Sequence, residues 1–70
     1  MTREFNILIE EDEDGVLVAS VPEIHGCHTQ ARSLDELMVR IREAIELCLE
    51  VNDIKPIPKF VGFQRISVDI

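Results

Sequence analysis

Residues 33–51, SLDELMVRIREAIELCLEV, decide the fold because they predict one amphipathic helix. Ser33 and Glu36 have the spacing of a capping box: the Ser33 hydroxyl accepts from the Glu36 amide, and the Glu36 carboxylate reaches back to the Ser33 amide. Apolar residues then recur at spacings of three and four, namely Leu34, Leu37, Met38, Ile41, Ile45, Cys48 and Leu49. We expect a helix that ends near Asn52 and buries this stripe.

Three short strands are predicted before the helix and one after it. Residues 3–11 alternate with a period of two, and residues 16–21 and 27–31 follow as further strands. Asp14-Gly15 supplies a hairpin turn between the first two, because glycine tolerates positive φ. Prolines between residues 54 and 58 predict an extended connector, and residues 60–70 a final strand. The fold class is therefore α+β: a two-layer β-β-β-α-β domain with one helix on one face of an antiparallel sheet.

Length and charge restrict the classes of function. Seventy residues make a single domain over 1–70, and a chain this short gains stability from oligomerisation. The formal net charge of −7 repels phosphate backbones, so we expect no direct binding of nucleic acid and favour a basic protein partner. No signal-peptide pattern or membrane-length apolar run is visible, so we expect a cytoplasmic protein, not bound to a membrane, with Cys27 and Cys48 as reduced thiols.

The residue types that carry chemistry do not form a recognisable catalytic or metal site. His25, Cys27 and His28 lack zinc-site spacing and a second ligand pair, and a Cys27 nucleophile would need a pocket that so small a domain scarcely makes. Asp12 and Asp14 precede a strand, whereas a calcium loop precedes a helix. We therefore expect no cofactor, no metal and no enzymatic activity.

Two surfaces are candidates for binding other proteins. The first, for a partner, combines five consecutive carboxylates at the hairpin with two apolar helix residues off the main stripe: Glu10, Glu11, Asp12, Glu13, Asp14, Val39 and Leu47. The second is an interface between copies of the chain, because residues 16–21 are apolar on both sheet faces and one helix hides only one face. Its expected members are Leu8, Ile66, Val68 and Ile70.

Residues 10–49 resemble the HicB-like antitoxin family. The resemblance rests on the acidic run ending in Gly15, the Pro-Glu-x-x-Gly-Cys turn of residues 22–27, Thr29, and the Ser-x-x-Glu start of the helix at Ser33. Ala31 and Leu37 stand where the family often has glycine and alanine, and no aromatic residue follows Gly15.

The resemblance implies a domain like a truncated RNase H fold that has lost its catalytic residues. It also implies an antitoxin that binds and occludes HicA, a small basic mRNA-cleaving toxin. Many members carry a C-terminal DNA-binding domain, which we do not expect here because the sequence ends at Ile70. Two alternatives stay open: a self-assembling structural domain with no toxin partner, and a residual nuclease or hydrolase.

Overall fold

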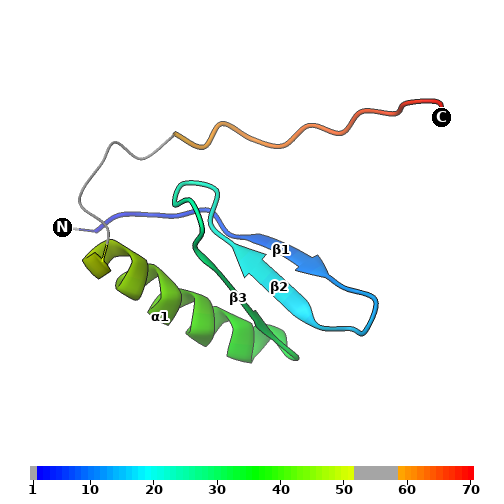
Figure 1. Ribbon diagram of the computed structural model, residues 1–70. Helices are drawn as coiled ribbons and strands as arrows, with labels where there is room; N and C mark the ends of the chain where they lie inside the picture. Colours follow the sequence, from blue (N-terminus) through cyan, green and yellow to red (C-terminus); the bar gives the residue numbers. More distant parts are fainter. Residues whose placement is uncertain (1, 52–58) are drawn as a thin grey trace.

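The computed structural model describes residues 2–51 and 59–70 and contains one sheet and one helix (Figure 1). The strands are β1 (Leu8–Glu11), β2 (Leu17–Ser20) and β3 (His28–Ala31), and the helix is α1 (Leu34–Val51). The strands pair antiparallel in the order β1-β2-β3, with Ile9 opposite Ala19 and Ala19 opposite Thr29. The predicted α+β class, with one helix packed on an antiparallel sheet, is confirmed.

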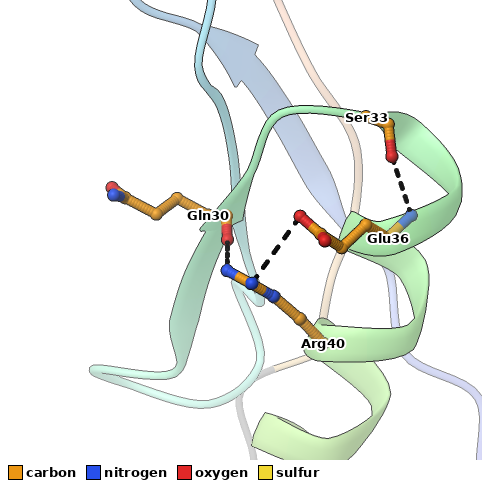
Figure 2. A network of polar contacts seen from close by, with 4 residues as sticks. All are labelled: Gln30, Ser33, Glu36 and Arg40. Atoms are coloured by element: carbon orange, nitrogen blue, oxygen red, sulfur yellow. Dashed lines mark hydrogen bonds and ion pairs between the residues drawn. The ribbon is translucent and has the colours of Figure 1, made fainter.

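The helix begins where the sequence predicts, at Ser33, but only half of the capping box forms. The Ser33 Oγ accepts a hydrogen bond of 3.2 Å from the Glu36 amide, which satisfies one of the free amides of the first turn (Figure 2). The Glu36 carboxylate turns away from Ser33 and pairs with Arg40, one helical turn later, at 3.6 Å. The expected return bond is therefore replaced by an i,i+4 ion pair.

The core lies between the helix and the inner face of β2 and β3. Its fully enclosed side chains come from these elements and from the loop after β2: Ala19, Val21, Ile24, Cys27, Ala31, Leu37 and Ile41. That loop is held by backbone hydrogen bonds, including Val21 N to Cys27 O at 3.0 Å, and Gly26 takes φ +80° within it. The Pro-Glu-x-x-Gly-Cys turn thus places the Ile24 side chain in the core.

The buried stripe of the helix is narrower than the sequence predicts. Leu37 and Ile41 are buried and Ile45 and Cys48 are half-buried, whereas Leu34, Met38 and Leu49 are exposed. The reason is coverage, because α1 packs over β3 and β2 and does not reach β1. A sheet of three short strands covers only the centre of the apolar stripe.

The predicted final strand does not form within this single chain. Residues 59–70 run extended but pair with none of the described strands (Figure 1). The first strand is also shorter than the predicted range 3–11, because residues 2–7 approach β1 without entering the ladder. The proline-rich connector at 54–58 lies outside the described residues.

Candidate interaction surfaces

The acidic hairpin is a preformed and exposed turn. The Asp12 Oδ1 accepts hydrogen bonds of 2.9 Å from the amides of Asp14 and of Val16, and Gly15 takes φ +80°. Asp12 therefore organises the turn through its side chain, as aspartate commonly does. Within residues 2–51 and 59–70, no such bond holds the other four carboxylates, which are exposed: Glu10, Glu11, Glu13 and Asp14. The turn fixes a cluster of negative charge in space.

The outward face of α1 is a second charged surface. Val39 and Leu47 are 61% and 60% exposed, as expected for residues off the buried stripe. Glu43 lies one turn from each of them, and Glu46 and Glu50 extend the same face. This face points away from the sheet, and α1 does not contact β1. The structure thus places the acidic hairpin and the Val39–Leu47 face on different sides of the domain.

A buried carboxylate that the sequence does not single out lies beside the start of β1. Glu23 is only 8% exposed, and its carboxylate accepts hydrogen bonds of 3.0 Å from both the backbone amide and the side-chain amide of Asn6. Burial by itself raises the pKa of Glu23, but the hydrogen bonds from Asn6 outweigh it and hold the pKa below 4.5. Glu23 is therefore an ionised acceptor at neutral pH and not a general acid.

A hollow of about 300 Å³ opens next to this pair. Residues 3–6, Glu23, Lys59 and Phe60 form its walls. It brings the start of the C-terminal segment beside the chain that leads into β1. Its one buried carboxylate, Glu23, is already engaged by Asn6 and is therefore not poised as a general acid.

The two cysteines meet in the core. Cys27 is buried at the end of the loop after β2, and half-buried Cys48 packs against it from α1. Burial raises the pKa of Cys27 to about 12. A hydrogen bond with the Cys48 side chain, and repulsion from the negative charge of Cys48 as a thiolate, act in the same direction. A thiol held protonated in this way is a poor nucleophile and a poor metal ligand. Among residues 2–51 and 59–70, no three His, Cys, Asp or Glu side chains cluster as a metal site would need.

The four residues expected at an interface between copies lie in two places. Leu8 is half-buried on β1, on the sheet face opposite Ile9, where Val18 of β2 is its half-buried apolar neighbour. The remaining described positions on that face are polar, so it is less apolar than the sequence suggests. Ile66, Val68 and Ile70 are exposed on the C-terminal segment, which is drawn apart from β1 in Figure 1.

The fold and these surfaces define a small α+β domain with an acidic exterior. No helix in the described part of the chain has the length and apolar character needed to cross a membrane. Residues 5–67 match the family described as the HicB-like antitoxin of bacterial toxin–antitoxin systems, and the chain belongs to that family. The resemblance inferred from the acidic run and the Pro-Glu-x-x-Gly-Cys turn is confirmed.

The chain is also similar to curated UPF0150 proteins of about the same length. A UPF0150 protein of Archaeoglobus fulgidus is 56% identical over 64 residues, which cover 91% of this chain and 93% of the relative. A UPF0150 protein of Synechocystis is 46% identical, over 94% of this chain and 96% of its own length. A third, from Thermotoga maritima, is 36% identical over 93% of this chain and 89% of its own.

Proposed function

We propose that this protein is an antitoxin module that binds and occludes a small basic mRNA-cleaving toxin of the HicA kind. Membership of the HicB-like family supports an antitoxin-type role. The observation that carries the proposal is the acidic hairpin, in which Asp12 orders the turn and leaves its neighbours as a fixed cluster of exposed carboxylates.

Charge supplies the rate of association in this proposal. The chain carries a net charge of −7, and a fixed acidic cluster attracts a basic protein over about 8–10 Å at physiological salt. Because the backbone of the turn is already ordered, less conformational entropy is lost at the hairpin when the partner arrives.

Apolar contacts supply the lifetime of the complex. Val39 and Leu47 are exposed on α1 between Glu43, Glu46 and Glu50, which suits a partner surface of basic residues around an apolar centre. In this proposal the toxin binds the Val39–Leu47 face of α1 with its catalytic surface, which is thereby covered. The acidic hairpin, on another side of the domain, raises the association rate through long-range attraction of the basic toxin.

The same proposal makes the protein a non-enzymatic, cytoplasmic binding domain. Its acidity disfavours direct contact with RNA or DNA, so inhibition acts through the toxin and not through the toxin's substrate. No observation favours the residual nuclease or hydrolase. Self-assembly is favoured by the exposed C-terminal segment and does not compete with toxin binding. The relation to a truncated RNase H fold stays a prediction.

Binding kinetics with a purified HicA-type toxin test the proposal. We expect the double variant Glu11→Gln/Glu13→Gln, which leaves Asp12 in place, to slow association roughly three- to tenfold at low salt and to change dissociation little. Val39→Ser/Leu47→Ser should instead speed dissociation.

The matched control is Glu4→Gln/Asp69→Asn. It changes the net charge from −7 to −5, as the hairpin variant does, at two exposed positions away from the hairpin. Equal slowing by the two double variants, or an on-rate that does not depend on salt, would contradict steering by the hairpin. Absence of binding by the unaltered protein would contradict the proposed function itself.

A further inference from the structure

The C-terminal segment, residues 59–70, leaves its apolar side chains from Val61 onward exposed to solvent. Val61, Phe63, Ile66 and Val68 are each at least 63% exposed, and Ile70 is fully exposed. Ile66, Val68 and Ile70 alternate with Arg65, Ser67 and Asp69, which is the pattern of a strand with one buried face. The segment runs free of the sheet and pairs with none of the described strands of its own chain (Figure 1).

The sheet has two edges, β1 and β3, and they differ in how freely their outward backbone groups can bond to an added strand. At the β3 edge, the Gln30 carbonyl points outward and accepts a hydrogen bond of 2.9 Å from Arg40 Nη1 (Figure 2). At the β1 edge, the hairpin bond from Asp12 N to Val16 O fixes which residues pair inward. Because antiparallel pairs alternate, Glu10 and Leu8 bond to β2, whereas the backbone groups of Ile9 and Glu11 point outward. An unpaired edge of this kind is a template for another strand.

The side chains of β1 suit such an added strand. Ile9 pairs with the core residue Ala19 and so faces the helix side of the sheet, yet it is 41% exposed because α1 does not reach β1. An added strand that turns Ile66, Val68 and Ile70 to this side covers Ile9, and it places Arg65 on the side of Glu10. The apolar neighbours are complementary, and Arg65 suits Glu10, while Asp69 lies on the same side farther along the segment.

We propose that residues 60–70 of one copy add to the outer edge of β1 of a second copy, in a reciprocal two-fold exchange. Each sheet then gains a fourth strand, which completes the β-β-β-α-β order that the sequence predicts. A second copy is the occupant because each chain carries both halves of the contact, a free edge and a free strand, and a two-fold axis satisfies both at once. The exchange does not depend on binding a toxin.

The test uses two proline variants of the full chain, each of which blocks one half of the contact. Val68→Pro removes a backbone donor at a position whose side chain is exposed. Glu11→Pro removes an outward donor of β1 and keeps the inward bonds to β2, and the Glu11 side chain is exposed. Ser67→Ala is the matched control in the segment, and circular dichroism of α1 checks that each domain is folded.

Light scattering at about 100 μM should show a dimer for the unaltered chain and for Ser67→Ala, and a monomer for each proline variant. Mixing the two proline variants should restore a heterodimer, because the intact segment of Glu11→Pro fits the intact edge of Val68→Pro. A monomeric or larger unaltered protein, a dimeric folded proline variant, or a mixture that stays monomeric would each overturn the exchange. Glu11→Pro alone also separates the exchange from pairing between two C-terminal segments, which would leave this variant a dimer.

Discussion

The guanidinium of Arg40 on α1 hydrogen-bonds the carbonyl oxygen of Gln30 on β3 at 2.9 Å, and its other terminal nitrogen lies 3.6 Å from the Glu36 carboxylate (Figure 2). One side chain thus joins the first turns of the helix to the edge of the sheet. The contact occupies a backbone acceptor that an edge strand otherwise presents to other chains. It ties the helix to β3 more firmly than apolar packing does alone.

Replacing Arg40 by alanine should lower the free energy of unfolding by about 0.5–1 kcal/mol. The loss combines one charge-assisted hydrogen bond and a weak ion pair, and it is reduced because the side chain is 51% exposed. Urea unfolding measures it. Arg42→Ala is the matched control, since Arg42 is an exposed arginine of the same helix with no such bond in the described structure. Equal losses in the two variants would show that the Gln30 contact contributes nothing.

Ser33→Ala should cost roughly 1 kcal/mol, the usual cost of removing an N-cap oxygen. The Ser33 Oγ is the acceptor for the Glu36 amide, which has no partner within the helix. Ser33→Asp should keep most of the stability, because a carboxylate also accepts from this amide and complements the helix dipole. Thermal or urea unfolding decides the matter, and a Ser33→Ala protein as stable as the unaltered one would contradict the cap.

Glu23→Gln should lower the free energy of unfolding at neutral pH. It should also make the free energy of unfolding fall less steeply than that of the unaltered protein as the pH is lowered into the acid range. Burial raises the pKa of Glu23, but the hydrogen bonds from Asn6 outweigh it and hold the pKa below 4.5 in the folded state. A carboxyl group with a lowered pKa contributes stability above its unfolded pKa and loses it as the pH falls through its folded pKa. We expect a cost of about 1–3 kcal/mol at pH 7, because a charge-assisted buried pair is weakened.

The control for Glu23 is Glu13→Gln, at an exposed carboxylate of the hairpin. Its unfolding curve should follow that of the unaltered protein at every pH. Parallel pH profiles for Glu23→Gln and the unaltered protein would mean that the Asn6–Glu23 pair does not stabilise the fold.

Cys27 should resist thiol reagents while the protein is folded. With its pKa raised to about 12, Cys27 is almost entirely a protonated thiol at pH 8. Its alkylation, followed residue by residue by mass spectrometry, should therefore be far slower than in the guanidinium-unfolded chain. Rapid modification of folded Cys27 at pH 8 would contradict its protonated, buried state.

The raised pKa of Cys27 also predicts that the free energy of unfolding falls at alkaline pH. The folded pKa of Cys27 lies above the ordinary value of 9.0, so the unfolded chain loses this proton first as the pH rises. The associated stability is fully present below about pH 9 and falls between pH 9 and 12. Cys27→Ala removes this slope while costing packing at all pH values, which separates titration from cavity formation.

The sequence by itself determined the local structure of this protein. The helix start at Ser33, the turn at Gly15 and the Pro-Glu-x-x-Gly-Cys loop follow from contacts between residues a few positions apart, which local residue types specify. The same local patterns carry the family resemblance. The acidic hairpin was also visible in this way, because its charge is contiguous in the chain.

Only the tertiary structure decided which residues are covered. Glu23 and Asn6 are 17 positions apart, so no local pattern marks one glutamate among many as buried. Leu34, Met38 and Leu49 belong to the apolar stripe yet stay exposed, since the extent of the sheet and not helical periodicity sets what α1 can bury. The final strand has the right pattern but pairs with none of the described strands of its own chain, because a strand's backbone hydrogen bonds require a suitably placed neighbouring strand, which sequence periodicity does not specify.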